Sequence, residues 1–219
     1  MSAAIDFHAH LGTRWDDVPG VRASVEDLAA ANRAGGVRHS VVSSLESLLS
    51  RTALGTDDDA RADRRLAAGN TVTLASCLGR SDLSLLAVAD PTQDGCLDQA
   101  ARLLAEADVA GIKLHPDRHH YEGGAFLGPV CALLARFPGK ILLVHCTGTR
   151  FSAPEPMIDA ALDYPAVPVV LAHLGRTDPP GRVIEHIRHR GAPNVYVDTA
   201  ALKIQVEGAL HHVGVHETH

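Results

Sequence analysis

The stretch Ile5–Leu11 reads IDFHAHL, and its side chains alternate between apolar and polar. Such alternation over a short run is typical of a β-strand, in which successive side chains point to opposite faces. Asp6, His8 and His10 then share one face of the strand. The sequence therefore predicts a strand that presents two imidazoles on the same side.

These two histidines form half of a candidate metal site. Two positions along a strand span about 6–7 Å, because each residue rises about 3.3 Å, so both imidazoles can reach one ion through nitrogen–metal bonds of about 2 Å. A catalytic site of this kind usually needs three protein ligands and an open position. We therefore expect further ligands elsewhere in the chain.

Length and composition favour one globular domain over residues 1–219. The net charge of −6 offers no basic surface for nucleic acid or anionic lipid, and no apolar run is long enough to span a bilayer. The first strand begins within a few residues of Met1, which leaves no room for a signal peptide, so we expect a cytoplasmic protein. The four cysteines are scattered without a Cys-x-x-Cys pair and are expected to be buried thiols.

Strand-like and helix-like stretches alternate along the chain, which is the signature of βα units and a parallel sheet. The expected strands cover residues 5–11, 39–45, 71–79, 110–115, 140–146, 167–174 and 194–200. The expected helices cover residues 24–33, 97–107, 125–137, 156–162, 181–189 and 202–213. Seven such strands without a Gly-x-Gly-x-x-Gly turn favour a barrel over an open doubly wound sheet.

Polar side chains end five of the expected strands. His8 and His10 lie on the first, Lys113 and His115 end the fourth, and three later strands end in His145, His173 and Asp198. Parallel barrels place their sites at the C-terminal ends of the strands, and uncompensated polar groups at that depth would cost a few kcal/mol each. We therefore expect these side chains to meet in one barrel mouth.

In the order and placement of these segments the chain resembles the amidohydrolase superfamily, in particular the metal-dependent hydrolases that include aminocarboxymuconate-semialdehyde decarboxylase. The resemblance is carried by DFHAH at residues 6–10, GVRHSVV at 36–42, GIKLHP at 111–116, VHCTG at 144–148, LAHLG at 171–175 and NVYVDT at 194–199. It implies an α/β fold of the TIM-like (β/α)8 type.

The resemblance also implies roles for individual residues. His8, His10 and His145 would bind a divalent metal, and His173 would be the catalytic residue in proton transfer. Lys113 would bridge two metals in a binuclear relative and would contact substrate in a mononuclear one, and the mononuclear reading is favoured here.

His115 would contact substrate. Arg14, Arg150 and Arg176 lie just beyond strand ends and are candidates for holding a substrate carboxylate, although arginines in such loops are more often solvated.

One departure from the family concerns its eighth strand, which carries Phe-Gly-Ser-Asp with a metal-binding aspartate. That motif is not found before the chain ends in HETH at residues 216–219, so we expect an incomplete barrel of seven βα units, C-terminally truncated. Asp198 is a candidate substitute ligand, and the metal site is expected to be weakened. The open barrel edges are expected to pair with a second copy or to aggregate.

The resulting prediction is a metal-dependent hydrolase that cleaves an amide, ester or lactone bond of a small molecule by a metal-activated water. Zinc is the expected ion, because all-nitrogen ligation suits it. A non-oxidative decarboxylase of the same superfamily is the close alternative. A catalytically dead barrel, acting as a pseudoenzyme or binding module, is the third reading.

Overall fold

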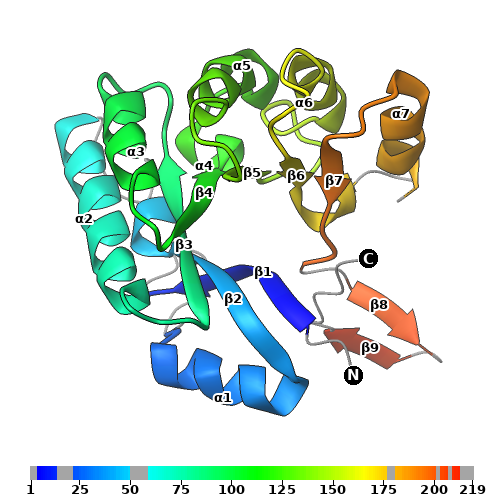
Figure 1. Ribbon diagram of the computed structural model, residues 1–219. Coiled ribbons are helices and arrows are strands. Elements are labelled where there is room, and N and C mark those ends of the chain that lie inside the picture. Colours follow the sequence, from blue (N-terminus) through cyan, green and yellow to red (C-terminus); the bar gives the residue numbers. More distant parts are fainter. Residues whose placement is uncertain are drawn as a thin grey trace.

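The computed structural model describes residues 4–13, 22–49, 59–176, 181–200, 203–206 and 209–212. Seven parallel strands form one sheet in chain order, and Figure 1 shows them as an arc with the helices outside it. The strands are β1 (Ala4–Leu11), β2 (Val37–Ser44), β3 (Leu83–Ala89), β4 (Val109–Leu114), β5 (Ile141–Val144), β6 (Val169–Leu171) and β7 (Val195–Val197). This is the incomplete TIM-like barrel that the sequence predicts.

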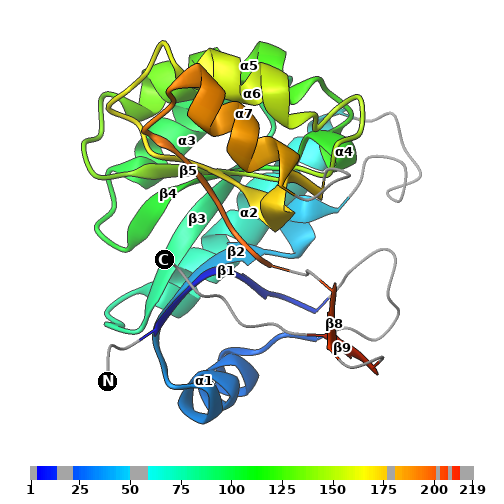
Figure 2. The ribbon, with the colours of Figure 1, turned by 90° about the vertical axis from the view of Figure 1, so that its right-hand side faces the viewer.

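Helices connect successive strands, as the right-handed βαβ arrangement requires. They are α1 (Val25–Gly35), η1 (Glu46–Leu48), α2 (Asp59–Cys77), α3 (Cys96–Leu104), α4 (Pro116–His119), α5 (Gly123–Leu134), α6 (Pro154–Ala161), η3 (Ala172–Arg176) and α7 (Arg182–Arg190). Figure 2 shows α5, α6 and α7 together on the outer face of the sheet.

The start of α1 is a capping box, as its sequence predicts. The Ser24 hydroxyl accepts a hydrogen bond from the backbone N–H of Asp27, and the Asp27 carboxylate accepts from the backbone N–H of Ser24. The helix ends at Gly35, and its C-cap Gly36 has a φ of 68°, the left-handed conformation that glycine adopts without penalty.

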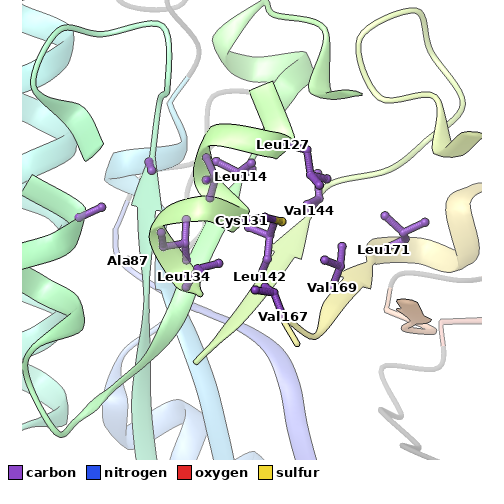
Figure 3. Packing of buried hydrophobic residues seen from close by; sticks show 14 of the residues in the cluster. Ala87, Leu114, Leu127, Cys131, Leu134, Leu142, Val144, Val167, Val169 and Leu171 are labelled. Atoms are coloured by element: carbon purple, nitrogen blue, oxygen red, sulfur yellow. The ribbon is translucent and has the colours of Figure 1, made fainter. Parts of the chain in front are cut away.

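The main core lies between the sheet and its helices. In Figure 3, Leu127, Cys131 and Leu134 of α5 pack over Leu142 and Val144 of β5. These side chains are fully or almost fully buried, so the helices fix the strand positions from outside. A second, smaller cluster on the other face of the sheet includes Val41, Leu86, Leu143 and Val170.

The expected third strand is wrong. Residues 71–79 belong mostly to α2, and the third strand is instead β3. Thr71, Val72 and Thr73 suggest a strand because β-branched residues favour sheets. However, Asn70, Thr73 and Cys77 are buried while Val72 is 68% exposed, which is the pattern of one helical face.

Asn70 also explains how α2 attaches to the sheet. Its side-chain amide donates to the Val88 carbonyl at 2.8 Å and accepts from the Val88 N–H at 2.9 Å. The pairing of β2 with β3 covers only residues up to Leu85, so Asn70 replaces the missing strand partner further along β3.

The helix expected over residues 202–213 is also not observed. The structure has two short antiparallel strands there, β8 (Lys203–Val206) and β9 (Ala209–His212). Ile204 and Val206 alternate with polar residues, a pattern that favours a strand. The HETH end at residues 216–219 lies outside the described residues.

Both edges of the seven-stranded sheet are open. Within the described ranges, β1 pairs only with β2, and β7 pairs only with β6. The sheet nevertheless curls far enough that residues at the ends of β1 and β7 meet, and this meeting point is where the histidines gather.

Candidate metal centre

Strand β1 contributes His8 and His10, whose ring centroids lie 5.1 Å apart in an edge-to-face arrangement. His8 is 7% exposed. Its backbone N–H donates to the carboxylate of Asp6 at 3.0 Å, so the start of the motif is held locally. The two imidazoles face the same region, as the alternation in the sequence predicts.

His145 and His173 reach this region from the ends of β5 and β6. His145 extends the sheet, since its backbone N–H donates to the Leu114 carbonyl of β4 at 2.9 Å. His173 begins a sharp turn in which it and Leu174 both adopt left-handed backbone conformations, with φ of 59° and 52°. Such conformations are uncommon for residues other than glycine and cluster at functional sites.

Asp198, directly after β7, holds this turn in place. Its carboxylate accepts from the backbone N–H of His173 at 2.7 Å and of Ala200 at 3.0 Å. Its backbone carbonyl accepts from the N–H of Leu174 at 2.8 Å. The second carboxylate oxygen lies 2.8 Å from Nδ1 of His8. Asp198 therefore joins β1 to the turn after β6.

The acceptors around His8 and His173 fix which ring nitrogen carries the proton. The Asp198 carboxylate can only accept, so Nδ1 of His8 donates to it. Nδ1 of His173 likewise donates to the Ala200 carbonyl at 2.7 Å. In the neutral rings, Nε2 of both histidines then keeps its lone pair.

The other two histidines also have an oxygen beside one ring nitrogen. Nδ1 of His10 lies 2.9 Å from the Ser43 hydroxyl. Nε2 of His145 lies 3.4 Å from the Asp117 carboxylate. In metal-binding histidines, the ring nitrogen that faces away from the ion (the outer nitrogen) commonly has such a partner, which orients the ring so that the other (inner) nitrogen faces the ion.

Two of the inner nitrogens converge on one region. Nδ1 of the expected ligand His145 and Nε2 of His173 lie 3.2 Å apart, close to the separation of about 3.3–3.4 Å between two ligands of a tetrahedral ion with bonds of about 2.0–2.1 Å, so His173 would lie beside an ion held by His145. The ring centroid of His173 lies 5.1 Å from that of His8 and 4.9 Å from that of His145. The residues present therefore fit a divalent ion.

Burial keeps these imidazoles neutral. It lowers the pKa of His8 to about 3, with the Lys113 ammonium as the next cause. Burial is also the main cause that lowers the pKa of His10, His145 and His173. A neutral imidazole is the form that binds metals, so at pH 7 the cluster is in its ligating state.

One combination of side chains in this cluster has all its donor atoms within 4.8 Å of one another, namely His8, His173 and Asp198. It shares His8 with the set expected from the sequence, in which His10 and His145 complete the ligands. Asp198 already accepts three hydrogen bonds, so its carboxylate is better placed to orient His8 than to bind an ion.

A family model described as Amidohydrolase matches residues 5–213. The chain belongs to the amidohydrolase family. Membership indicates an enzyme, and amidohydrolases are typically metal-dependent, consistent with a group of side chains here that can hold an ion.

Solved structures share the fold of this amidohydrolase. Amidohydrolase 2 from Bifidobacterium longum subsp. infantis is 16% identical, covers 90% of this chain and 72% of its own, and has a TM-score of 0.51. The Metarhizium anisopliae IDCase in apo form is 13% identical, covers 85% of this chain and 70% of its own, and has a TM-score of 0.51. No curated protein matches the chain.

Lys113 lies among the clustered histidines of this amidohydrolase and is fully buried. Its ammonium nitrogen lies 3.0 Å from Nε2 of His8. Burial lowers the pKa of Lys113 to about 7, and the Asp198 carboxylate opposes this shift. The Lys113 amine therefore faces Nε2 of a histidine that the family resemblance implies as a metal ligand.

His115 packs its ring on His145, with centroids 3.8 Å apart and an interplanar angle of 16°. It is 5% exposed. The expected substrate residues Lys113 and His115 thus lie beside the expected ligands, and the seven residues expected in the barrel mouth belong to one contiguous cluster.

The arginines predicted to hold a substrate carboxylate are less informative. Arg14 lies outside the described residues. Arg150 is 76% exposed at its side chain, lies over the Phe151 ring and is 4.0 Å from Glu122. Arg176 is exposed at the end of η3. Their role in substrate binding stays a prediction.

Asp117 and Ser43 are functional candidates that the sequence analysis missed. Asp117 immediately follows the GIKLHP segment, so its position beside a strand end could have indicated it. Ser43 lies on β2 and has no distinguishing sequence signal.

Among the described residues, no helix is long and apolar enough to cross a membrane.

Proposed function

We propose that this amidohydrolase hydrolyses an amide, ester or lactone bond in a small molecule with the help of a divalent ion. The observation that carries the proposal is the cluster of four neutral imidazoles, each with an oxygen beside its outer nitrogen. That arrangement supports a metal centre, because metal-binding histidines commonly have their outer nitrogen held in this way, and Nδ1 of His145 and Nε2 of His173 converge to 3.2 Å.

His8, His10 and His145 would hold the ion, and zinc suits a set of three nitrogens. When bound, the ion supplies Lewis-acid polarisation of the scissile carbonyl and lowers the pKa of a nucleophilic water. Asp198 lies beside this set as an orienting group, and its ligation in place of a family aspartate is the alternative within the same proposal.

His173 would move the proton during the reaction. Its Nδ1–H is held by the Ala200 carbonyl, so Nε2 is the basic atom and faces the other imidazoles. A neutral histidine held in one tautomer can accept a proton from an attacking water and return it to the leaving group.

Lys113 and His115 would face the substrate. Nδ1 of His115 is buried and has no hydrogen-bond partner within the described part of the chain. Buried polar atoms are rarely left unpaired, which supports a substrate group or water as its partner.

The metal content of the purified protein tests the proposal. After incubation with Zn²⁺ and removal of free ion, we expect about one zinc per chain in the wild type and in His189→Ala, whose histidine is exposed on α7. We expect the zinc to be lost in His145→Ala. A wild type that retains no zinc would contradict the proposal.

Hydrolysis of a panel of nitrophenyl esters, lactones and amides separates an enzyme from a dead barrel. The hydrolase proposal requires activity that falls when the zinc is removed and returns when it is restored. Stoichiometric zinc without turnover on any of these classes, or on carboxylic acids that could lose carbon dioxide, would favour the binding-module reading.

The open edges of β1 and β7 would pair with a second copy of the chain. Light scattering tests this part of the proposal, and a monomer across a range of concentrations would contradict it. The cytoplasm is the proposed location.

A further inference from the structure

We propose that Asp117 is a positioning residue that holds His145 with its proton on Nε2 and its Nδ1 lone pair directed into the cluster. The effect of this on metal affinity rests on the function proposed above. The effect on the His145 tautomer does not, because it concerns only the chain's own hydrogen bonds.

Asp117 and His115 approach His145 from the same short segment after β4. The ring of His115 covers one face of the His145 ring at 3.8 Å. The Asp117 carboxylate lies against its edge, 3.4 Å from Nε2. Two residues of one segment thus restrict both the plane of the ring and its rotation within that plane.

The Asp117 carboxylate is itself fixed by the loop that follows His145. It accepts hydrogen bonds from the hydroxyls of Ser152 at 2.6 Å, of Thr147 at 3.2 Å and of Thr149. Ser152 is fully buried. Ser152 and Thr147 donate to Oδ2 and Thr149 donates to Oδ1. Oδ2 is also the oxygen 3.4 Å from Nε2 of His145, so its negative charge favours a proton on that nitrogen.

Backbone N–H groups fix two of the loop hydroxyls. The Ser152 hydroxyl accepts from the Thr147 N–H at 3.2 Å, and the Thr149 hydroxyl accepts from the Ser152 N–H at 3.2 Å. A carboxylate held by such a network can orient an imidazole without moving.

A neutral His145 has one N–H and two acceptors that compete for it. One is the Asp117 carboxylate, and the other is Nε2 of His173, 3.2 Å from Nδ1 of His145. His173 cannot supply this hydrogen, because its own proton is committed to the Ala200 carbonyl. A charged carboxylate is the stronger acceptor, so Asp117 draws the proton to Nε2.

This assignment gives His145 the tautomer that a metal ligand needs. With the proton on Nε2, Nδ1 of His145 and Nε2 of His173 both present lone pairs to the same point. Without Asp117, the proton would move to Nδ1 and form a hydrogen bond to His173, which would occupy both nitrogens.

Nitrogen-15 NMR of the metal-free protein tests the tautomer directly. The His145 signals are assigned by their disappearance in His145→Gln. We expect Nε2 to carry the proton in the wild type and in Asp94→Asn, an exposed aspartate that serves as the control. In Asp117→Leu, which removes the acceptor and keeps the branched shape of the side chain, we expect the proton on Nδ1.

Zinc affinity provides the second measurement. Loss of a residue that orients a ligand typically weakens metal binding by about 10–100-fold, and we expect this loss in Asp117→Leu. Asp117→Asn should fall between Asp117→Leu and the wild type, because its amide oxygen still accepts from Nε2–H. Circular dichroism confirms that each variant is folded.

The two measurements separate this inference from the proposed function. An unchanged His145 tautomer in a folded Asp117→Leu would overturn the inference, whatever the zinc affinity. A wild type that binds no zinc but shows the tautomer change would support Asp117 as a positioning residue and contradict the metal-dependent function. Unchanged zinc affinity with an altered tautomer would overturn the link to the metal.

Discussion

The carboxylate of Asp198 accepts a hydrogen bond of 2.8 Å from Nδ1 of His8, although the two residues are 190 positions apart in the chain. His8 lies on β1 and Asp198 directly follows β7, the two edge strands of the open sheet. The bond therefore closes the mouth of a barrel that the backbone leaves open. The same carboxylate also supports the left-handed turn at His173.

We predict that Asp198→Asn lowers the free energy of unfolding by about 1.5–3 kcal/mol, because it weakens several charge-assisted hydrogen bonds at once. Urea denaturation measures this change, with Asp94→Asn as the matched exposed control. The metal affinity distinguishes the two roles of Asp198. If Asp198 only orients a ligand, its substitution should weaken metal binding by about 10–100-fold. Complete loss of the metal would instead identify Asp198 as a ligand.

The sequence predicted the barrel and the residues of its mouth well, for a physical reason. Parallel strands bring their C-terminal ends to one side, so histidines in the C-terminal half of β1 and directly after β5 and β6 are enough to place His8, His145 and His173 together. The third strand was mistaken because Thr71 and Val72 favour strands locally. The burial of Asn70, Thr73 and Cys77 on one helical face decides the outcome, and only the tertiary contacts show it.

The outer contacts of the site could not be predicted from the sequence. Asp117 reaches His145 only because the loop hydroxyls of Thr149 and Ser152 fix its carboxylate, and no spacing rule reports such a contact. Asp198 is a candidate ligand from the sequence, and only the curl of the sheet shows that its carboxylate also lies 2.8 Å from Nδ1 of His8. Contacts that depend on curvature and loop conformation require the structure.

A substitution at Lys113 distinguishes one metal from two. We predict that Lys113→Met retains one zinc per chain and binds it at least as tightly as the wild type at pH 7, because the ammonium 3.0 Å from Nε2 of His8 repels a cation. The advantage should shrink above pH 8, since burial lowers the pKa of Lys113 to about 7. Lys140→Met, outside the site, is the control. Loss of zinc in Lys113→Met would instead indicate a lysine that takes part in metal binding.

Acid should destabilise the metal-free protein at a pH where most folded proteins remain stable. Burial lowers the pKa of His8 from 6.5 to about 3, so between these values the unfolded chain binds a proton that the folded chain does not. The free energy of unfolding then falls by about 1.4 kcal/mol per pH unit for His8 alone as the pH drops, and the other buried histidines add to it.

Urea denaturation at several pH values from 7.5 to 4.5 measures this slope. His8→Asn should reduce the slope by about the contribution of one proton, whereas His189→Asn on the exposed face of α7 should leave it unchanged. A free energy of unfolding that stays constant between pH 6.5 and 4.5 would show that the imidazoles are not buried in their neutral form.

The pairing of β4 with β5 brings Lys113 and His145 into the same mouth, and Gly111 makes that pairing possible. A Cβ at Gly111 would overlap the backbone carbonyl of Ile141 and lie 2.8 Å from its carbonyl carbon. The strands would have to separate, because backbone atoms cannot yield as a flexible side chain can. We predict that Gly111→Ala lowers the free energy of unfolding by about 1–3 kcal/mol and weakens zinc binding.

Gly35→Ala is the matched control, since a Cβ there would meet only the Val37 side chain at 3.8 Å, an ordinary contact. Alanine at the end of α1 should raise the free energy of unfolding by about 0.5–1 kcal/mol, because glycine loses more conformational entropy in a helix. Urea denaturation of both variants gives the comparison. If Gly111→Ala were as stable as Gly35→Ala, β4 and β5 could not be in close contact at this point, and the register that joins Lys113 to the histidines would be wrong.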